Sequence, residues 1–125
     1  MNNALNQFEK QQYINIETFR KNGQGVKTPV WFAQDGDTLH IWTEISSGKA
    51  KRIRNNASVR IAPSTATGEA VGEWVNATAV TDASEEKVGY TETLFKNKYG
   101  FIFSFLSRLN KWRGSKFITI QVKVN

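Results

Sequence analysis

Alternating apolar and polar positions predict one strand near the beginning of the chain and another soon after it. Tyr13 to Arg20 alternates, and strand-like composition resumes from Val26 to Gln34 after the segment KNGQG. Two strands joined by a short glycine-containing connection predict an antiparallel β-hairpin. Pro29 lies within the second strand and has no N–H to donate, so we expect an edge or a bulge there.

A second hairpin is predicted where the turn Asp35-Gly36-Asp37 leads into Thr38 to Thr43, with Leu39 and Ile41 facing inward. His40 lies on the opposite face of that strand. We expect an exposed strand histidine in preference to a catalytic one, because no carboxylate or nucleophile is visibly paired with it. The other predicted strands are Ser58 to Pro63, Val71 to Thr81 and Phe117 to Val124.

Helical patterns of unequal strength occur in four other segments. A weak helical pattern covers Asn2 to Gln11, and Ser47 is placed to cap a helix that runs to about Asn55. Asp82 is expected to cap a longer helix over roughly Ser84 to Tyr99, which Gly100 would end.

The fourth helical pattern, Phe101 to Trp112, carries a single apolar stripe, made of Ile102, Phe105, Leu106, Leu109 and Trp112. We interpret this stripe as a core or subunit contact in preference to a membrane anchor.

About six strands, the early ones joined as hairpins, together with two or three helices predict a mainly β protein with an antiparallel sheet. In a chain of 125 residues, a small β-barrel with appended helices is the natural way to remove exposed sheet edges. We expect residues 1–125 to form one domain.

Composition removes several classes of chemistry. The chain contains no cysteine and one histidine, which excludes disulfides and thiol nucleophiles and argues against a histidine-built metal site. No signal peptide is visible, and the longest apolar run, Phe101 to Leu106, is too short to span a bilayer. We therefore expect a soluble cytoplasmic protein with no membrane partner.

Positive charge is concentrated around the helix that follows Ser47. The formal net charge is +6, and five basic residues but no acidic one occur between Ile45 and Gly68. A serine- and glycine-rich helix start offers free backbone N–H groups, and Lys49 and Arg52 share one face of this helix. The combination is typical of an anion site, most often for phosphate. The alternative is a basic helix that only faces solvent.

No catalytic constellation is visible. The single histidine cannot be assigned as a base to any serine, the carboxylates form no obvious acid–base pair, and the glycine-rich nucleotide motifs are absent. An enzyme with these residues would take its chemistry from a cofactor. A cofactor phosphate would lie at the start of the basic helix, and Trp31, Trp42 and Trp74 could stack against a ring system. We assign no catalytic residue and no metal ligand.

Three sequence blocks resemble one known family. The blocks are TFRKNGQGVKTPVWF, LHIWTEISSGKAKRIRNNASVRIAP and GEWVNATA, which occur in this order between Tyr13 and Thr81. They closely resemble the pyridoxamine 5'-phosphate oxidase-like, FMN-binding split barrels, and among these the branch of deazaflavin-dependent oxidoreductases that use coenzyme F-420. The resemblance implies a six-stranded antiparallel split β-barrel that forms a homodimer, with two cofactor sites at the subunit interface.

The same resemblance implies which residues hold the cofactor. The strand that contains Thr28, Pro29 and Val30 would border the ring and the phosphate. The pair Trp42-Thr43 and the run Ser47-Gly48-Lys49 would hold the phosphate. Trp74 of the other subunit would approach the ring. We add Arg52 to the phosphate ligands, because it shares a helix face with Lys49.

Two positions depart from the family pattern. Flavin-binding members carry arginine where this chain has Gly48 and Thr28. Loss of two charged donors should weaken FMN binding by several kcal/mol, taking about 1.5–3 kcal/mol for each hydrogen bond. Lys51, Arg52 and Arg54 could compensate, or could serve the longer anionic tail of the deazaflavin coenzyme.

We therefore predict an oxidoreductase that binds FMN or coenzyme F-420 and passes hydride between that cofactor and a small organic acceptor. A second hypothesis is a protein that stores or carries a flavin, haem or similar ring without turnover. A third is a nucleic-acid binder, suggested by acid-free basic stretches with aromatic residues among them. We disfavour the third, because the basic residues cluster at a helix start and not along a strand face.

Overall fold

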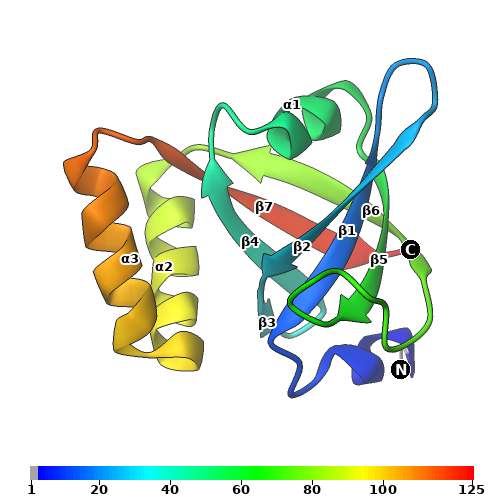
Figure 1. Cartoon of the computed structure of the whole chain (residues 1–125), viewed down its shortest axis with the longest axis horizontal. Helices are drawn as coiled ribbons and strands as arrows, with labels where there is room; N and C mark the ends of the chain where they lie inside the picture. Colours follow the sequence, from blue (N-terminus) through cyan, green and yellow to red (C-terminus); the bar gives the residue numbers. More distant parts are fainter. Residues whose placement is uncertain (1–2) are drawn as a thin grey trace.

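Seven strands and four helical segments make up residues 3–125, the part of the chain that this computed structural model describes (Figure 1). The strands are β1 (Tyr13–Phe19), β2 (Gly25–Trp31), β3 (Ala33–Asp35), β4 (Thr38–Glu44), β5 (Ser58–Ser64), β6 (Val75–Asp82) and β7 (Phe117–Val124). The helices are the short 3-10 helix η1 (Asn3–Phe8), α1 (Gly48–Asn55), α2 (Glu85–Tyr99) and α3 (Phe101–Trp112). The weak helix expected over Asn2 to Gln11 is thus a 3-10 helix, and residue 2 lies outside the described residues.

All seven strands form one antiparallel sheet in the order β2-β1-β5-β6-β7-β4-β3. Only Phe32 separates β2 from β3, so the two ends of this order are one continuous piece of chain. The sheet therefore curls round and returns to its first strand. Figure 1 shows α1 above one end of the curled sheet, and α2 and α3 side by side along one outer side. The predicted mainly β, antiparallel split barrel is confirmed.

The sheet has seven strands, one more than expected, because the predicted strand Val26 to Gln34 breaks at Phe32. At the break, the hydroxyl of Tyr99 accepts a hydrogen bond from the Phe32 N–H at 3.0 Å, and the ammonium of Lys98 donates to the Phe32 carbonyl at 2.7 Å. Trp31 stacks on the Tyr99 ring with 4.2 Å between centroids. Side chains from the end of α2 thus replace a neighbouring strand at this position.

The core has two parts on opposite sides of the sheet. Apolar side chains from β1, β4, β5, β6 and β7 fill the barrel interior, where Ile53 of α1 and Phe8 of η1 join them. A smaller cluster lies between the outer face of the sheet and the α2–α3 pair, and consists of Ala33, Phe95 and Phe103, packed with Trp31, Trp42, Leu94 and Tyr99. The helices are therefore fixed to the barrel mainly through aromatic side chains.

The expectation that His40 is exposed is wrong. Its relative exposure is 4%, because α2 covers the outer face of β4. The imidazole Nδ1 lies 3.5 Å from the Thr91 hydroxyl, and the ring packs edge-on against Tyr90. Burial lowers the pKa of His40, although the charge of Asp35 acts in the opposite direction.

Two predicted boundaries differ from the structure. β6 begins at Val75 and not at Val71, because the preceding segment bonds elsewhere: the Val71 N–H donates to the Pro63 carbonyl, and the Glu73 N–H donates to the Gln7 side chain at 2.8 Å. The N-cap of α2 is Ser84 and not Asp82. Ser84 Oγ accepts a hydrogen bond from the Lys87 N–H in the first turn of the helix. The Asp82 carboxylate accepts a hydrogen bond from the Ser84 N–H, which precedes the helix.

Helix α3 packs on α2 through the side opposite its apolar stripe. Phe103 and Ser107 are the buried residues of this helix. The stripe is exposed, so its interpretation as core is wrong for the described chain, whereas a subunit contact stays a prediction. Among residues 3–125, no helix is long and apolar enough to cross a membrane.

Candidate anion-binding site

Helix α1 begins with a turn that Ser47 caps. Ser47 has extended backbone angles, and its Oγ accepts a hydrogen bond from the Ala50 N–H at 3.2 Å. Ala50 and Ile53 are buried, and they fix the helix against the end of the barrel. The N–H groups of the first turn have no acceptor within the helix, and the helix dipole makes this end partly positive. The N-terminus of α1 is therefore a candidate anion-binding site.

The basic residues of α1 divide between two environments. Lys49 and Arg52 are half-buried, whereas Lys51 and Arg54 are exposed. Burial lowers the pKa of Lys49, Arg52 lowers it further, and Glu44 raises it. This agrees with the three-residue spacing, which places Lys49 and Arg52 on one face of the helix.

Arg52 lies directly over the first residue of its own helix. Its Nε donates to the Thr18 hydroxyl of β1 at 2.7 Å. A Cβ atom added to Gly48 would lie 2.8 Å from Arg52 Nη1, so the guanidinium covers the side of Gly48 where a side chain would begin. Burial lowers the pKa of Arg52, and the charge of Arg20 at the end of β1 lowers it further.

This group of cations forms no ion pair, although the charge of Glu44 acts on Lys49. Within residues 3–125, the ion pairs are Arg60 with Glu17 and Lys111 with Glu92. Lys49, Arg52 and Arg20 therefore have no carboxylate within ion-pair distance among the described residues. Such an arrangement is favourable for a bound anion and unfavourable without one.

The β2 residues assigned to the site lie along an open edge. Thr28, Pro29 and Val30 pair with Ile16, Asn15 and Ile14 of β1, and the described residues place no strand on the other side of β2. This position confirms the edge expected from Pro29. The unpaired N–H and C=O groups of such an edge are available to a ligand or a second chain.

Thr43 and Trp42 lie next to each other on β4 but face different surroundings. Thr43 is 7% exposed and leads into the turn before α1, where the Ile45 N–H donates to the Lys116 carbonyl. The indole of Trp42 stacks on Phe117 with 3.7 Å between centroids, and its Nε1 donates to Glu92. Trp42 is therefore part of the aromatic cluster beneath the helices.

Trp74 lies apart from the α1 residues. Its ring packs between the cations of Lys27 and Arg60, at 4.9 and 5.2 Å from the ring centroid. These two residues come from β2 and β5, on either side of β1. The structure thus brings together Ser47, Gly48, Lys49 and Arg52 at the start of α1. Thr43 is buried on β4, four residues before Ser47, and neither Trp42 nor Trp74 joins that group within one chain.

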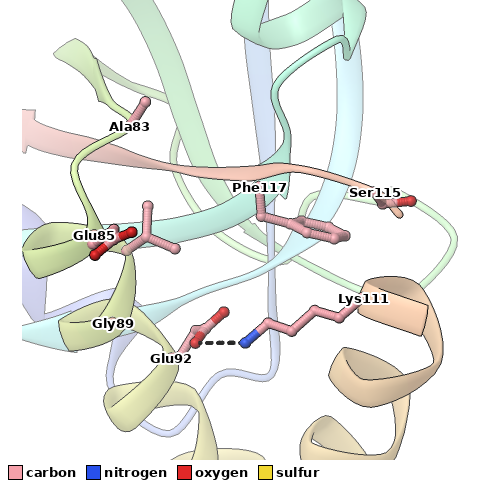
Figure 2. A pocket seen from close by; sticks show the side chains of 8 residues that line it. Ala83, Glu85, Gly89, Glu92, Lys111, Ser115 and Phe117 are labelled. Atoms are coloured by element: carbon pink, nitrogen blue, oxygen red, sulfur yellow. Dashed lines mark hydrogen bonds and ion pairs between the residues drawn. The ribbon is translucent and has the colours of Figure 1, made fainter. Parts of the chain in front are cut away.

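The hollows found in the described part of the chain lie elsewhere. One, of about 300 Å³, is lined by α2, α3 and the start of β7. In Figure 2 the side chains of Glu92 and Lys111 point toward one another across it, with Phe117 close by, and the two charges pair at 3.2 Å. Three others, of about 250 to 430 Å³, are also lined by no residue of α1. Gly48 is exposed, so the start of α1 lies outside these hollows and at the surface of a single chain.

Sequence reasoning missed the contributions of Arg20 and Thr18. The alternation of β1 places Thr18 on the inward face with Ile14 and Ile16, which is a readable signal. Nothing local indicates that α1 lies over this end of β1. Neither the strands nor the helices form a metal site, since residues 3–125 contain no cluster of three or more histidine, cysteine or carboxylate side chains that could hold an ion.

Solved structures with the same fold include proteins named as a heme storage protein, an oxidase and a reductase. The heme storage protein HutZ from Vibrio cholerae shares 15% identity at a TM-score of 0.71, over 94% of this chain and 84% of that one. A pyridoxamine 5'-phosphate oxidase candidate from Listeria innocua shares 17% identity at a TM-score of 0.66, over 97% and 90% of the two chains. An F-420 reductase shares 14% identity at a TM-score of 0.59, over 100% and 95%.

These likenesses establish the split-barrel fold, which agrees with the resemblance found in the sequence. No model of a known protein family matches the chain, and no curated protein does.

Proposed function

We propose that the chain binds the phosphate of FMN or of coenzyme F-420 at the start of α1 and acts as an oxidoreductase that passes hydride to or from a small organic acceptor. The observation that carries the proposal is the unpaired cation group of Lys49, Arg52 and Arg20 around the exposed N–H groups of α1. The fold shared with an F-420 reductase supports the cofactor class.

The residues divide the work of binding. Lys49 and Arg52 would neutralise the phosphate, while the Ser47 hydroxyl, which already accepts from Ala50, keeps its proton to donate. Thr43 would add a second hydroxyl from the end of β4. The bound flavin or deazaflavin would supply the hydride chemistry. The protein's part is positioning and electrostatics, and no side chain is assigned as an acid or base.

Arg52 offers a physical reason why glycine is tolerated at position 48. The guanidinium that covers Gly48 lies beside the place where an arginine side chain at position 48 would begin. A cation from the next helical turn thus takes the place of the missing one. This arrangement supports retention of phosphate binding, and it leaves FMN and coenzyme F-420 as alternatives.

The cofactor ring requires walls that one chain does not supply. The open edge of β2 at Thr28, Pro29 and Val30 would form one wall. In a homodimer, Trp74 of the second copy would form another wall. Trp42, which is stacked on Phe117, would lie behind the site and support it. The open surface at α1 supports a site completed by a second copy.

Titration of the purified protein with FMN and with coenzyme F-420, followed by absorbance, tests the proposal. Replacing Lys49 by alanine should weaken binding of the preferred cofactor at least tenfold, which corresponds to one charged hydrogen bond. Lys96→Ala is the matched control, because Lys96 is an exposed lysine on α2 and is not assigned to the site. Equal affinities for the wild type and Lys49→Ala would sink the assignment of the phosphate to α1.

A carrier without turnover is the second candidate, favoured by the likeness to a heme storage protein. The single histidine argues against haem ligation, since His40 is buried under α2 and faces Thr91 and Tyr90. A flavin carrier remains compatible with the cation group. Protein that binds cofactor saturably but reduces no member of a panel of acceptors would establish the carrier in place of the enzyme.

A further inference from the structure

Helix α3 presents a continuous apolar face on the outside of the molecule. The side chains at its first and last positions are the most exposed, with Phe101 at 82% and Trp112 at 85%. The residues between them on this face are Ile102, Phe105, Leu106 and Leu109, each at least 36% exposed. Figure 1 shows α3 as the outermost element on its side of the molecule, with α2 between it and the barrel. Large apolar faces of this kind mark binding surfaces.

The polar residues of α3 and of the segment that follows it are all neutral or basic. Arg108 is exposed beside the apolar face, and Arg113 and Lys116 follow directly after the helix. After Glu92 the sequence contains seven basic residues and no acidic one. Only Lys111 of this group has a carboxylate partner among the described residues, and that partner belongs to α2.

We propose that α3 lies on the surface of membranes that contain anionic lipids, with its apolar face in the headgroup region. A helix with aromatic and aliphatic residues along one side and cations at its flank has the pattern of an interfacial helix. Because α3 is the outermost element on its side and buries Phe103 and Ser107 on the opposite side, its apolar face points away from the rest of the molecule. Basic residues close to that surface add attraction to anionic headgroups.

The charge near α3 favours an anionic membrane over a second copy of the chain as the partner of the apolar face. Pairing two α3 helices would bring together two segments that each carry uncompensated cations, in a protein of net charge +6. An anionic bilayer supplies the opposite charge and an apolar layer at once. This inference replaces the expectation of no membrane partner, and it does not depend on cofactor binding at α1.

Co-sedimentation with vesicles tests the proposal, using phosphatidylcholine alone and phosphatidylcholine mixed with an equal amount of phosphatidylglycerol. The protein should sediment with the mixed vesicles and much less with phosphatidylcholine alone, and added salt should release it. Phe105→Ser should weaken the partition coefficient about tenfold, from the loss of one buried aromatic side chain. Arg108→Gln should weaken it about fivefold on the mixed vesicles only.

Val80→Ser is the matched control, because Val80 is also exposed, at 57%, but lies on β6 away from α3. It should bind vesicles like the wild type. Tryptophan emission gives a second readout: Trp112 should shift to shorter wavelength on the mixed vesicles, and Trp112→Phe should bind but lose this shift. Equal circular dichroism and melting temperature among the variants would show that each is folded.

Failure to sediment with either vesicle would overturn the proposal. So would equal, salt-independent binding to both vesicle types, since the basic flank would then have no role. Self-association that Phe105→Ser abolishes, without vesicle binding, would assign the face to a second copy instead.

Discussion

Helices α1 and α3 both leave a chemically distinctive face outside the barrel, and the two faces are opposite in kind. α1 buries its two apolar positions, Ala50 and Ile53, and leaves cations at its start. α3 buries Phe103 and Ser107 and leaves large aromatic and aliphatic side chains outside. The first face suits a small anion, and the second suits an extended apolar surface.

The difference shows that a packing partner decides which apolar positions a helix buries. α1 has only two apolar positions on one side, so a single way of packing satisfies it. α3 has more apolar positions than the α2 contact can cover, and the side with Phe103 fits between Phe95 and Trp42. The longer stripe is left outside although it is the more apolar side.

The largest expected effect is a difference in stability between substitutions on the two sides of α3. Phe103→Ala should lower the free energy of unfolding by about 3–5 kcal/mol, because it empties a site in the aromatic cluster. Phe105→Ala should change it by less than about 0.5 kcal/mol, since this side chain is 64% exposed. Urea denaturation of the two variants measures both values. Equal losses would show that the stripe is covered in solution, and the contrast with α1 would then fail.

Elements that depend on neighbours in sequence were predictable. The hairpin of β1 and β2 and the Ser47 cap follow from local sequence patterns, and the structure confirms them. The break at Phe32 was not predictable, because its hydrogen-bond partners lie at Lys98 and Tyr99, far along the chain.

The same limit applies to the candidate site. The inward position of Lys49 and Arg52 follows from their three-residue spacing. The approach of Arg52 to Thr18 and Arg20 depends on how α1 lies across the end of the barrel, which periodicity does not specify. The cofactor roles of these residues stay predictions, as does the contribution of Trp74 from a second copy.

A positive charge added at the start of α1 should strengthen the binding of a cofactor phosphate there. Gly48→Arg should raise FMN affinity about tenfold, the lower end of the effect of a charged hydrogen bond, because Arg52 must give way to the new side chain. Gly89→Arg is the control, since it adds the same charge on α2 in open space. Isothermal titration with FMN measures both. An equal gain at both positions would mean that overall charge, and not the α1 start, controls affinity.

The helix caps give a smaller effect. Ser47→Ala should cost about 1 kcal/mol of stability and should also weaken cofactor binding. Ser84→Ala removes a comparable cap, the bond from the Lys87 N–H, and should cost about as much stability without any change in affinity. Thermal melts and cofactor titrations on the two variants compare them. A loss of affinity in Ser84→Ala would show that the effect at Ser47 is only structural.

The smallest expected effect is a decrease in cofactor affinity at alkaline pH, which depends on Lys49 of α1. Burial and Arg52 lower the pKa of Lys49 below that of an ordinary lysine, 10.5. Anion binding needs the charged ammonium, so cofactor affinity should fall a few-fold as pH rises through this lowered pKa. The phosphate of FMN is already dianionic in this pH range, so its own charge does not change. Lys49→Arg should abolish the fall, because arginine stays charged. Titrations at a series of alkaline pH values measure it, and a parallel fall in Lys49→Arg would contradict it.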